Sequence, residues 1–145
     1  MGGARYLMLF FLVLLFLSAC THADQWTTSH IKIKGLDSGL TRTLYHTKDK
    51  VNGIDIELLE AKEHLTAYLQ VHSQTIPPCK NDPKKCSGEL IVRDRTYLFL
   101  AERHAGGQRL NVPQDIQTLM IKLIEEKKSF TLKIEGYEET VPFKI

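Results

Sequence analysis

The sequence of residues 111–128 is NVPQDIQTLMIKLIEEKK, and this stretch has a different apolar period from the segments on either side of it. Its apolar residues recur every three or four positions, as on one face of an α-helix. Asn111 is a suitable N-cap, and Pro113 fits the first turn, where a missing N–H breaks no hydrogen bond. Asp115 complements the positive end of the helix dipole. The stretch predicts one amphipathic helix over about 112–128, with its apolar stripe in the core.

After this helix the apolar period becomes two, which is the period of a β-strand. Residues 130–134 alternate between apolar and polar side chains, Gly136 turns the chain, and residues 141–145 complete a hairpin. Pro142 cannot donate a hydrogen bond to a neighbouring strand. We therefore predict that the last strand lies at an edge of the sheet.

Before the helix, several further segments alternate between apolar and polar residues. Turn signals such as Asn52-Gly53 separate them and favour hairpins. Residues 96–101 differ because they are apolar on both faces, which predicts a central strand or one that is covered on its second face. The alternating segments are residues 31–33, 54–58, 65–71 and 90–92.

These patterns predict an α+β fold that is mainly antiparallel β. We expect a meander, or a partly closed barrel or sandwich, of about six to eight strands, with the helix of residues 112–128 before a C-terminal hairpin. A helix before the final hairpin resembles the arrangement of the OB-fold, although extra strands at the front make the resemblance loose. The chain has 145 residues, and residues 30–145 have the length of a single β-rich domain.

The first twenty residues contain an export signal. Residues 6–17 are apolar, and Leu17-Ser18-Ala19-Cys20 closes this run. The run is too short for a membrane-spanning helix, which needs about 20 residues, and it suits the apolar region of a signal peptide. A leucine, two small residues and a cysteine form a lipobox, so the chain resembles a bacterial lipoprotein precursor. The alternative is an ordinary cleaved signal peptide.

The resemblance implies that residues 1–19 are removed and that Cys20 becomes an N-terminus carrying acyl chains such as palmitate. The polar residues 20–29 are then the lipidated cysteine and a tether that reaches on the order of 30 Å. Thr21 stands where an inner-membrane retention signal of enteric bacteria has aspartate. We therefore expect a lipid-anchored protein of the cell envelope, with the outer membrane favoured over the inner and the periplasmic side favoured over the cell surface.

The charge balance argues against a nucleic-acid partner. The formal net charge is +2, and loss of Arg5 with the signal segment lowers it to +1. A nearly balanced charge gives no broad basic face. The expected partners are the membrane, through the lipid, and a protein of the envelope.

Two cysteines remain once Cys20 is acylated. An even pair in an exported protein predicts a disulfide between Cys79 and Cys86. Closing this small loop would contribute about 2–3 kcal/mol to stability. Metal binding competes weakly, because the spacing differs from that of zinc-binding cysteines and the segment contains no histidine.

The same loop is rich in lysine, with only Asp82 in opposition. One interpretation is a basic contact surface for an acidic partner or for lipid headgroups, because ordered exposed loops often carry binding residues. The other is a solvated turn that its lysines keep soluble. The candidate contact residues are Lys80, Lys84 and Lys85.

The sequence contains none of the common catalytic or cofactor-binding motifs. Its six histidines lack ligand spacing, and His64 and His72 fall on the polar face of a predicted strand. Residues 102–107 combine an acid, a histidine and a glycine loop, but nothing in the sequence completes a catalytic set around them. We predict no catalytic residue, no metal and no cofactor, and hence no enzyme.

The function that we expect is a non-enzymatic binding or assembly module at an envelope membrane. One alternative is an inhibitor of a cell-wall-lytic enzyme, which would use the Cys79–Cys86 loop or the Gly106-Gly107 loop. A carrier of a small hydrophobic ligand and an envelope hydrolase are the others. A cavity between helix and sheet would favour the carrier, and a polar pocket near Glu102 and His104 would favour the hydrolase.

Overall fold

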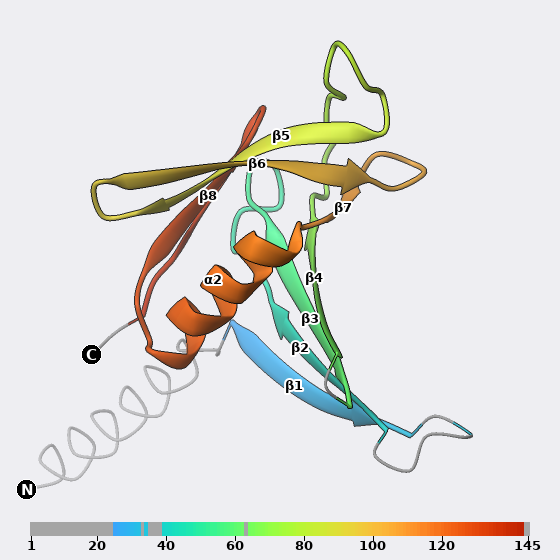
Figure 1. The fold of residues 1–145 in the computed structure, drawn as a ribbon, viewed down its shortest axis with the longest axis vertical. Coiled ribbons are helices and arrows are strands. Elements are labelled where there is room, and N and C mark those ends of the chain that lie inside the picture. Colours follow the sequence, from blue (N-terminus) through green and yellow to red (C-terminus); the bar gives the residue numbers. More distant parts are fainter. Residues whose placement is uncertain (1–24, 33, 35–38, 63, 144–145) are drawn as a thin grey trace, which may run out of the picture.

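The computed structural model describes residues 25–32, 34, 39–62 and 64–143. The predicted lipobox and Cys20 lie outside these residues. The described part of the chain forms one helix and nine strands, all paired antiparallel (Figure 1). The elements are β1 (Trp26–Ile31), β2 (Leu40–Tyr45), β3 (Asp55–Ala61), β4 (His64–Gln70), β5 (Lys85–Val92), β6 (Arg95–Arg103), β7 (Arg109–Asn111), α2 (Gln114–Glu125), β8 (Phe130–Ile134) and β9 (Tyr137–Val141).

The strands form a single open sheet in the order β1-β2-β3-β4-β7-β6-β5-β8-β9. The predicted α+β, mainly antiparallel fold is confirmed. The last strand lies at an edge, but it spans Tyr137–Val141 and ends before Pro142, where we predicted residues 141–145. Three of the nine strands, β1, β2 and β7, do not match a predicted strand. β2 was not predicted because Leu40 and Leu44 are four positions apart, so its apolar residues do not alternate. β1 includes residues 26–29, which we had assigned to the tether, and it is polar because almost all of its residues are exposed. β7 has only three residues, too few to show a period.

The short strand β7 joins two halves of the sheet. It pairs with Tyr68–Gln70 of β4 on one side and with Glu102 and Arg103 of β6 on the other. Beyond these few pairs β4 and β6 diverge, and Figure 1 shows α2 lying across the angle between the two halves. The sheet is therefore one hydrogen-bonded ladder with an opening beside β6.

The apolar stripe of α2 packs into the core, as predicted. Ile116, Met120 and Leu123 are buried in one cluster with side chains from both halves of the sheet. The helix is shorter than predicted, and the predicted cap is wrong. Asn111 is not the N-cap because it belongs to β7 and pairs with both neighbouring strands. The N-cap is Pro113, which makes no side-chain cap hydrogen bond.

The two outer strands of the sheet approach each other. The ring of Trp26 at the start of β1 lies 6.2 Å from that of Phe143, just after β9, and 5.0 Å from that of Tyr45. The backbone N–H of Glu138 donates to the carbonyl of Asn52 over 2.9 Å. These contacts curve the open sheet around α2.

A carboxyl group is buried where these ends meet. Glu139 Oε1 is buried and has no hydrogen-bond partner among the described residues. Burial raises the pKa of Glu139 above its ordinary value of 4.5, although a hydrogen bond from Thr47 opposes the shift. The folded state therefore holds this proton more tightly than the unfolded chain.

Glu139 should make stability depend on pH. The free energy of unfolding should rise as the pH falls through the raised pKa, because the cost of a buried charge disappears. We expect Glu139→Gln to be more stable than the natural chain at neutral pH, with the difference gone near its ordinary pKa of 4.5. Urea unfolding across this range measures the effect, with exposed Glu138→Gln as control. A less stable Glu139→Gln at neutral pH would contradict the prediction.

Candidate functional site

The predicted disulfide is wrong, since Cys79 and Cys86 are free in the structure. Cys86 is buried and points into the core from β5, whereas Cys79 Sγ lies 3.4 Å from the hydroxyl of Ser87, the next residue along β5. Consecutive strand residues face opposite sides of a sheet, so the two thiols lie on opposite faces. The loop is closed by backbone hydrogen bonds instead, including that from Cys79 N–H to the carbonyl of Lys85 over 2.9 Å.

The two thiols should react at very different rates. Cys79 is half-buried at the loop, while burial raises the pKa of the Cys86 thiol and keeps reagents away from it. In a Cys20→Ser chain we expect a chromogenic thiol reagent to titrate Cys79 in the folded protein and Cys86 only after unfolding. Cys86→Ala is the control. Absence of both thiols in unreduced, denatured protein would show that a disulfide forms.

The three lysines of the loop do not form one patch. Lys80 and Lys84 are exposed, and the backbone N–H of Lys84 is held by the carboxylate of Asp82 at 3.0 Å. Lys85 is the first residue of β5, and its Nζ lies 3.6 Å from Glu102 Oε1 on β6. A partner for this loop stays a prediction.

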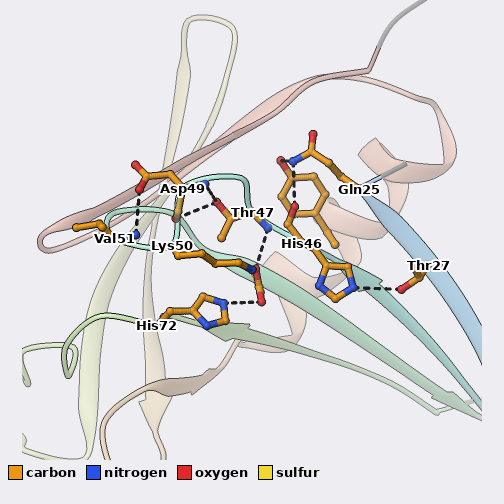
Figure 2. Close-up of polar contacts among 10 residues, drawn as sticks. Gln25, Thr27, His46, Thr47, Asp49, Lys50, Val51 and His72 are labelled. Atoms are coloured by element: carbon orange, nitrogen blue, oxygen red, sulfur yellow. Dashed lines mark hydrogen bonds and ion pairs between the residues drawn. The ribbon is translucent and has the colours of Figure 1, made fainter. Parts of the chain in front are cut away.

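The most extensive polar cluster, drawn in Figure 2, holds the loop between β2 and β3. His72 Nε2 lies 2.7 Å from Asp55 Oδ2, and the N–H of Thr47 donates to the other oxygen of Asp55 over 2.8 Å. Ser73 Oγ donates to the carbonyl of Val51 over 2.6 Å. His72 therefore has an orienting carboxylate, but no serine or cysteine of the described residues is hydrogen-bonded to it.

A second polar cluster lies on the outer face of β2, β3, β4 and β7. Glu57 accepts a hydrogen bond from Arg42 Nε at 2.8 Å and another from Arg109. Arg109 covers the ring of Tyr68 at 3.9 Å, and the ring of His104 lies 5.5 Å from the same tyrosine. His104 is thus engaged with Tyr68, while Glu102 faces Lys85, so the acid and histidine of residues 102–107 have different partners.

An open groove crosses the other half of the sheet. Its floor includes two large apolar side chains, Leu98 and Leu100 of β6, which are 75% and 57% exposed. Its walls are Pro113 and Asp115 at the start of α2 and the turn between β8 and β9. The groove has a volume of about 1210 Å³. Its lining residues with side chains on the outer face of the sheet are Ser87, Glu89, Leu98, Leu100, Lys133, Glu135 and Glu138.

The register of the strands sets the pattern of these side chains. Leu98 lies opposite Glu89 of β5, and Glu89 lies opposite Lys133 of β8. Lys133 in turn lies opposite Glu138 of β9. Cross-strand partners share a face of the sheet, so one row across the groove runs from an apolar side chain to alternating charges.

The hydrogen bonds at the end of β6 show which way its backbone groups point. Arg103 N–H donates to the carbonyl of Lys84, before β5, over 2.7 Å. The next N–H, that of His104, donates to the carbonyl of Arg109 in β7 over 2.9 Å. Because the direction alternates along an antiparallel strand, the even-numbered residues of β6 direct their N–H and C=O groups away from β5.

This alternation leaves part of β6 with an open edge. β7 pairs with Glu102 and Arg103 only, so among the described residues no strand lies beside Thr96, Leu98 and Leu100. A strand near the middle of the sheet order thus has an edge available over about half its length. The sequence predicted that this strand is central or covered, and the structure shows that the covering is missing on its outer face.

A second hollow continues the groove along this edge. It has a volume of about 440 Å³ and shares Leu100 and Pro113 with the larger groove. Glu102 lines it but His104 does not. Its other residues come from the start of β4, the start of α2, Lys85 of β5 and Asn111 of β7. No serine or cysteine is among its described lining residues.

β5 and β6 pack closely on the core face of the sheet, opposite the side chains of Leu98 and Leu100. A Cβ atom at Gly88 would lie 2.4 Å from the ring of Phe99, the residue opposite it in the ladder. Gly88 therefore lets the Phe99 ring lie against the backbone of β5. The glycine was not recognised from the sequence, because its role depends on a residue in another strand.

No protein-family model, curated protein or solved structure matches the chain. In the described ranges, no three histidine, cysteine, aspartate or glutamate residues are grouped so that they could hold a metal ion. The same residues include no helix with the length and apolarity needed to cross a membrane.

Proposed function

We propose that the chain is a lipid-anchored binding or assembly module of the bacterial envelope, which holds an extended segment of a partner protein against the open edge of β6. The observation that carries the proposal is the unpaired stretch at Thr96, Leu98 and Leu100, beside a groove floored by exposed leucines. An added strand would satisfy the free backbone groups and cover the apolar side chains, which is how strand addition works.

Both parts of such an interaction contribute to affinity. Three alternate residues offer an N–H and a C=O each, and each net hydrogen bond is worth about 0.5–1.5 kcal/mol. Full burial of a leucine side chain contributes about 1.5–3 kcal/mol. Hydrogen bonds to the partner's backbone would contribute affinity whatever the partner's sequence. The side chains around the groove would determine which sequences bind.

The proposed anchor keeps this groove close to a membrane. With Cys20 acylated, β1 begins at Trp26, so the intervening residues span at most about 20 Å when fully extended. This is shorter than the tether that we expected from the sequence. The absence of aspartate after Cys20 supports the outer membrane as the location, and we propose its periplasmic side.

The open groove supports a protein partner over the other candidates. A carrier of a small hydrophobic ligand encloses most of the surface of its ligand, whereas Leu98 remains 75% exposed. A cell-wall-lytic enzyme that this chain inhibits would be one kind of protein partner.

Site-specific crosslinking in cells tests the proposal. A photoreactive amino acid at Thr96, an exposed residue on the open edge, should crosslink one envelope protein through a single segment. The same probe at Thr118, exposed on α2, is the matched control. A synthetic peptide of the crosslinked segment should then bind the purified chain. Equal crosslinking from both positions, or crosslinking from Lys80 alone, would overturn the proposal. Cys20→Ser with membrane fractionation tests the anchor.

A further inference from the structure

We infer that the segment held beside β6 is cationic, with lysine or arginine at alternate positions. This inference rests on the proposed function and adds the chemistry of the partner to it. Four carboxylates line the groove and one ammonium group opposes them. The carboxylates are those of Glu89, Asp115, Glu135 and Glu138, and the ammonium group is that of Lys133.

These carboxylates are available to an incoming cation. In the part of the chain that the structure describes, none of the four is in an ion pair, although five ion pairs of lysine or arginine with a carboxylate are formed elsewhere. Lys133 lies between Glu89 and Glu138 in the ladder, so it offsets part of their charge. An excess of three negative charges remains in the groove, and the chain as a whole is slightly positive.

The carboxylates border the groove on opposite sides. Asp115 is in the first turn of α2, where it offsets the positive end of the helix dipole. Glu135 and Glu138 flank the turn between β8 and β9 at the other wall. On a strand added beside β6, a cationic side chain over Leu98 therefore meets Glu89 across that leucine and Asp115 at the start of α2, and a carboxylate of the partner meets repulsion from both.

The exposed leucines of β6 also favour lysine and arginine in the partner segment. A strand added to β6 places every second side chain on the face that carries Leu98 and Leu100. Lysine and arginine have long aliphatic stems with a charge at the end, so the stem covers a leucine while the charge reaches a carboxylate. A short polar or an acidic side chain matches only part of this surface.

Binding of synthetic peptides tests the inference with the full chain in a non-ionic detergent. Three extended peptides alternate valine with lysine, threonine or glutamate. The lysine peptide should bind most tightly, by about tenfold over threonine, and its affinity should fall with salt. Glu89→Lys combined with Asp115→Lys should remove this preference, whereas Glu125→Lys, exposed at the end of α2 outside the groove, should keep it.

The outcomes separate the two claims. Equal binding of the three peptides, lost in each case on Leu98→Pro, would overturn the cationic preference and leave edge binding in place. Binding of the lysine peptide that Leu98→Pro leaves unchanged would overturn edge binding itself. Charge reversal without effect on the lysine peptide would contradict the assignment of Glu89 and Asp115.

Discussion

Replacing Leu98 with proline is expected to abolish binding of the partner segment while the domain stays folded. The N–H of Leu98 points away from β5, so proline removes a hydrogen-bond donor that the fold does not use. The proline ring also occupies the place where an added strand would lie. We expect affinity for the crosslinked segment, or for the lysine peptide, to fall by more than about a hundredfold.

Two matched variants show whether the backbone edge is responsible. Leu98→Ala keeps the N–H and removes the apolar side chain, so it should weaken binding by only about tenfold. Phe99→Pro removes an N–H that bonds to β5, and it should unfold the hairpin. Unchanged binding by a folded Leu98→Pro chain would rule out strand addition at this edge.

Gly88→Val is expected to cost about 3 kcal/mol of unfolding free energy, a large effect for a single substitution. Even the first atom of the new side chain would lie 2.4 Å from the ring of Phe99. The ring is buried in the core cluster and the next strand lies on the far side of Gly88, so little room exists for relaxation. Urea unfolding of the full chain in detergent measures the change.

If a clash with the Phe99 ring causes the loss of stability, a smaller side chain at position 99 should relieve it. Phe99→Leu in the Gly88→Val background should recover part of the lost stability, as expected for residues in direct contact. Ser87→Val, one position along β5 and exposed, should change stability by less than about 0.5 kcal/mol. A Gly88→Val chain as stable as the natural one would contradict the packing of Phe99 over β5.

Elements whose apolar residues repeat with a clear period could be predicted from the sequence. The buried stripe at Ile116, Met120 and Leu123 repeats at helical spacing, and the hairpin of β8 and β9 alternates around Gly136, so both were predicted. β1 and β7 could not be predicted in this way. The first is polar because it is exposed, and the second is too short to alternate.

The candidate site could be predicted only in part. The run of residues 96–101, apolar on both faces, did indicate a strand with an unusual environment, but sequence alone does not show what covers a face. The pairing of Cys79 with Cys86 followed from their number and compartment. It failed because the parity of β5 turns Cys86 into the core and leaves Cys79 beside Ser87.

Hydrogen exchange at single backbone amides of β6 is the most direct test of the open edge. In the free chain the N–H of Phe99 should exchange slowly, because it bonds to β5, while that of Leu98 should exchange fast. On addition of the lysine peptide, the exchange at Leu98 should slow toward that of Phe99. Slow exchange at Leu98 in the free chain, or unchanged exchange with the peptide bound, would contradict the account.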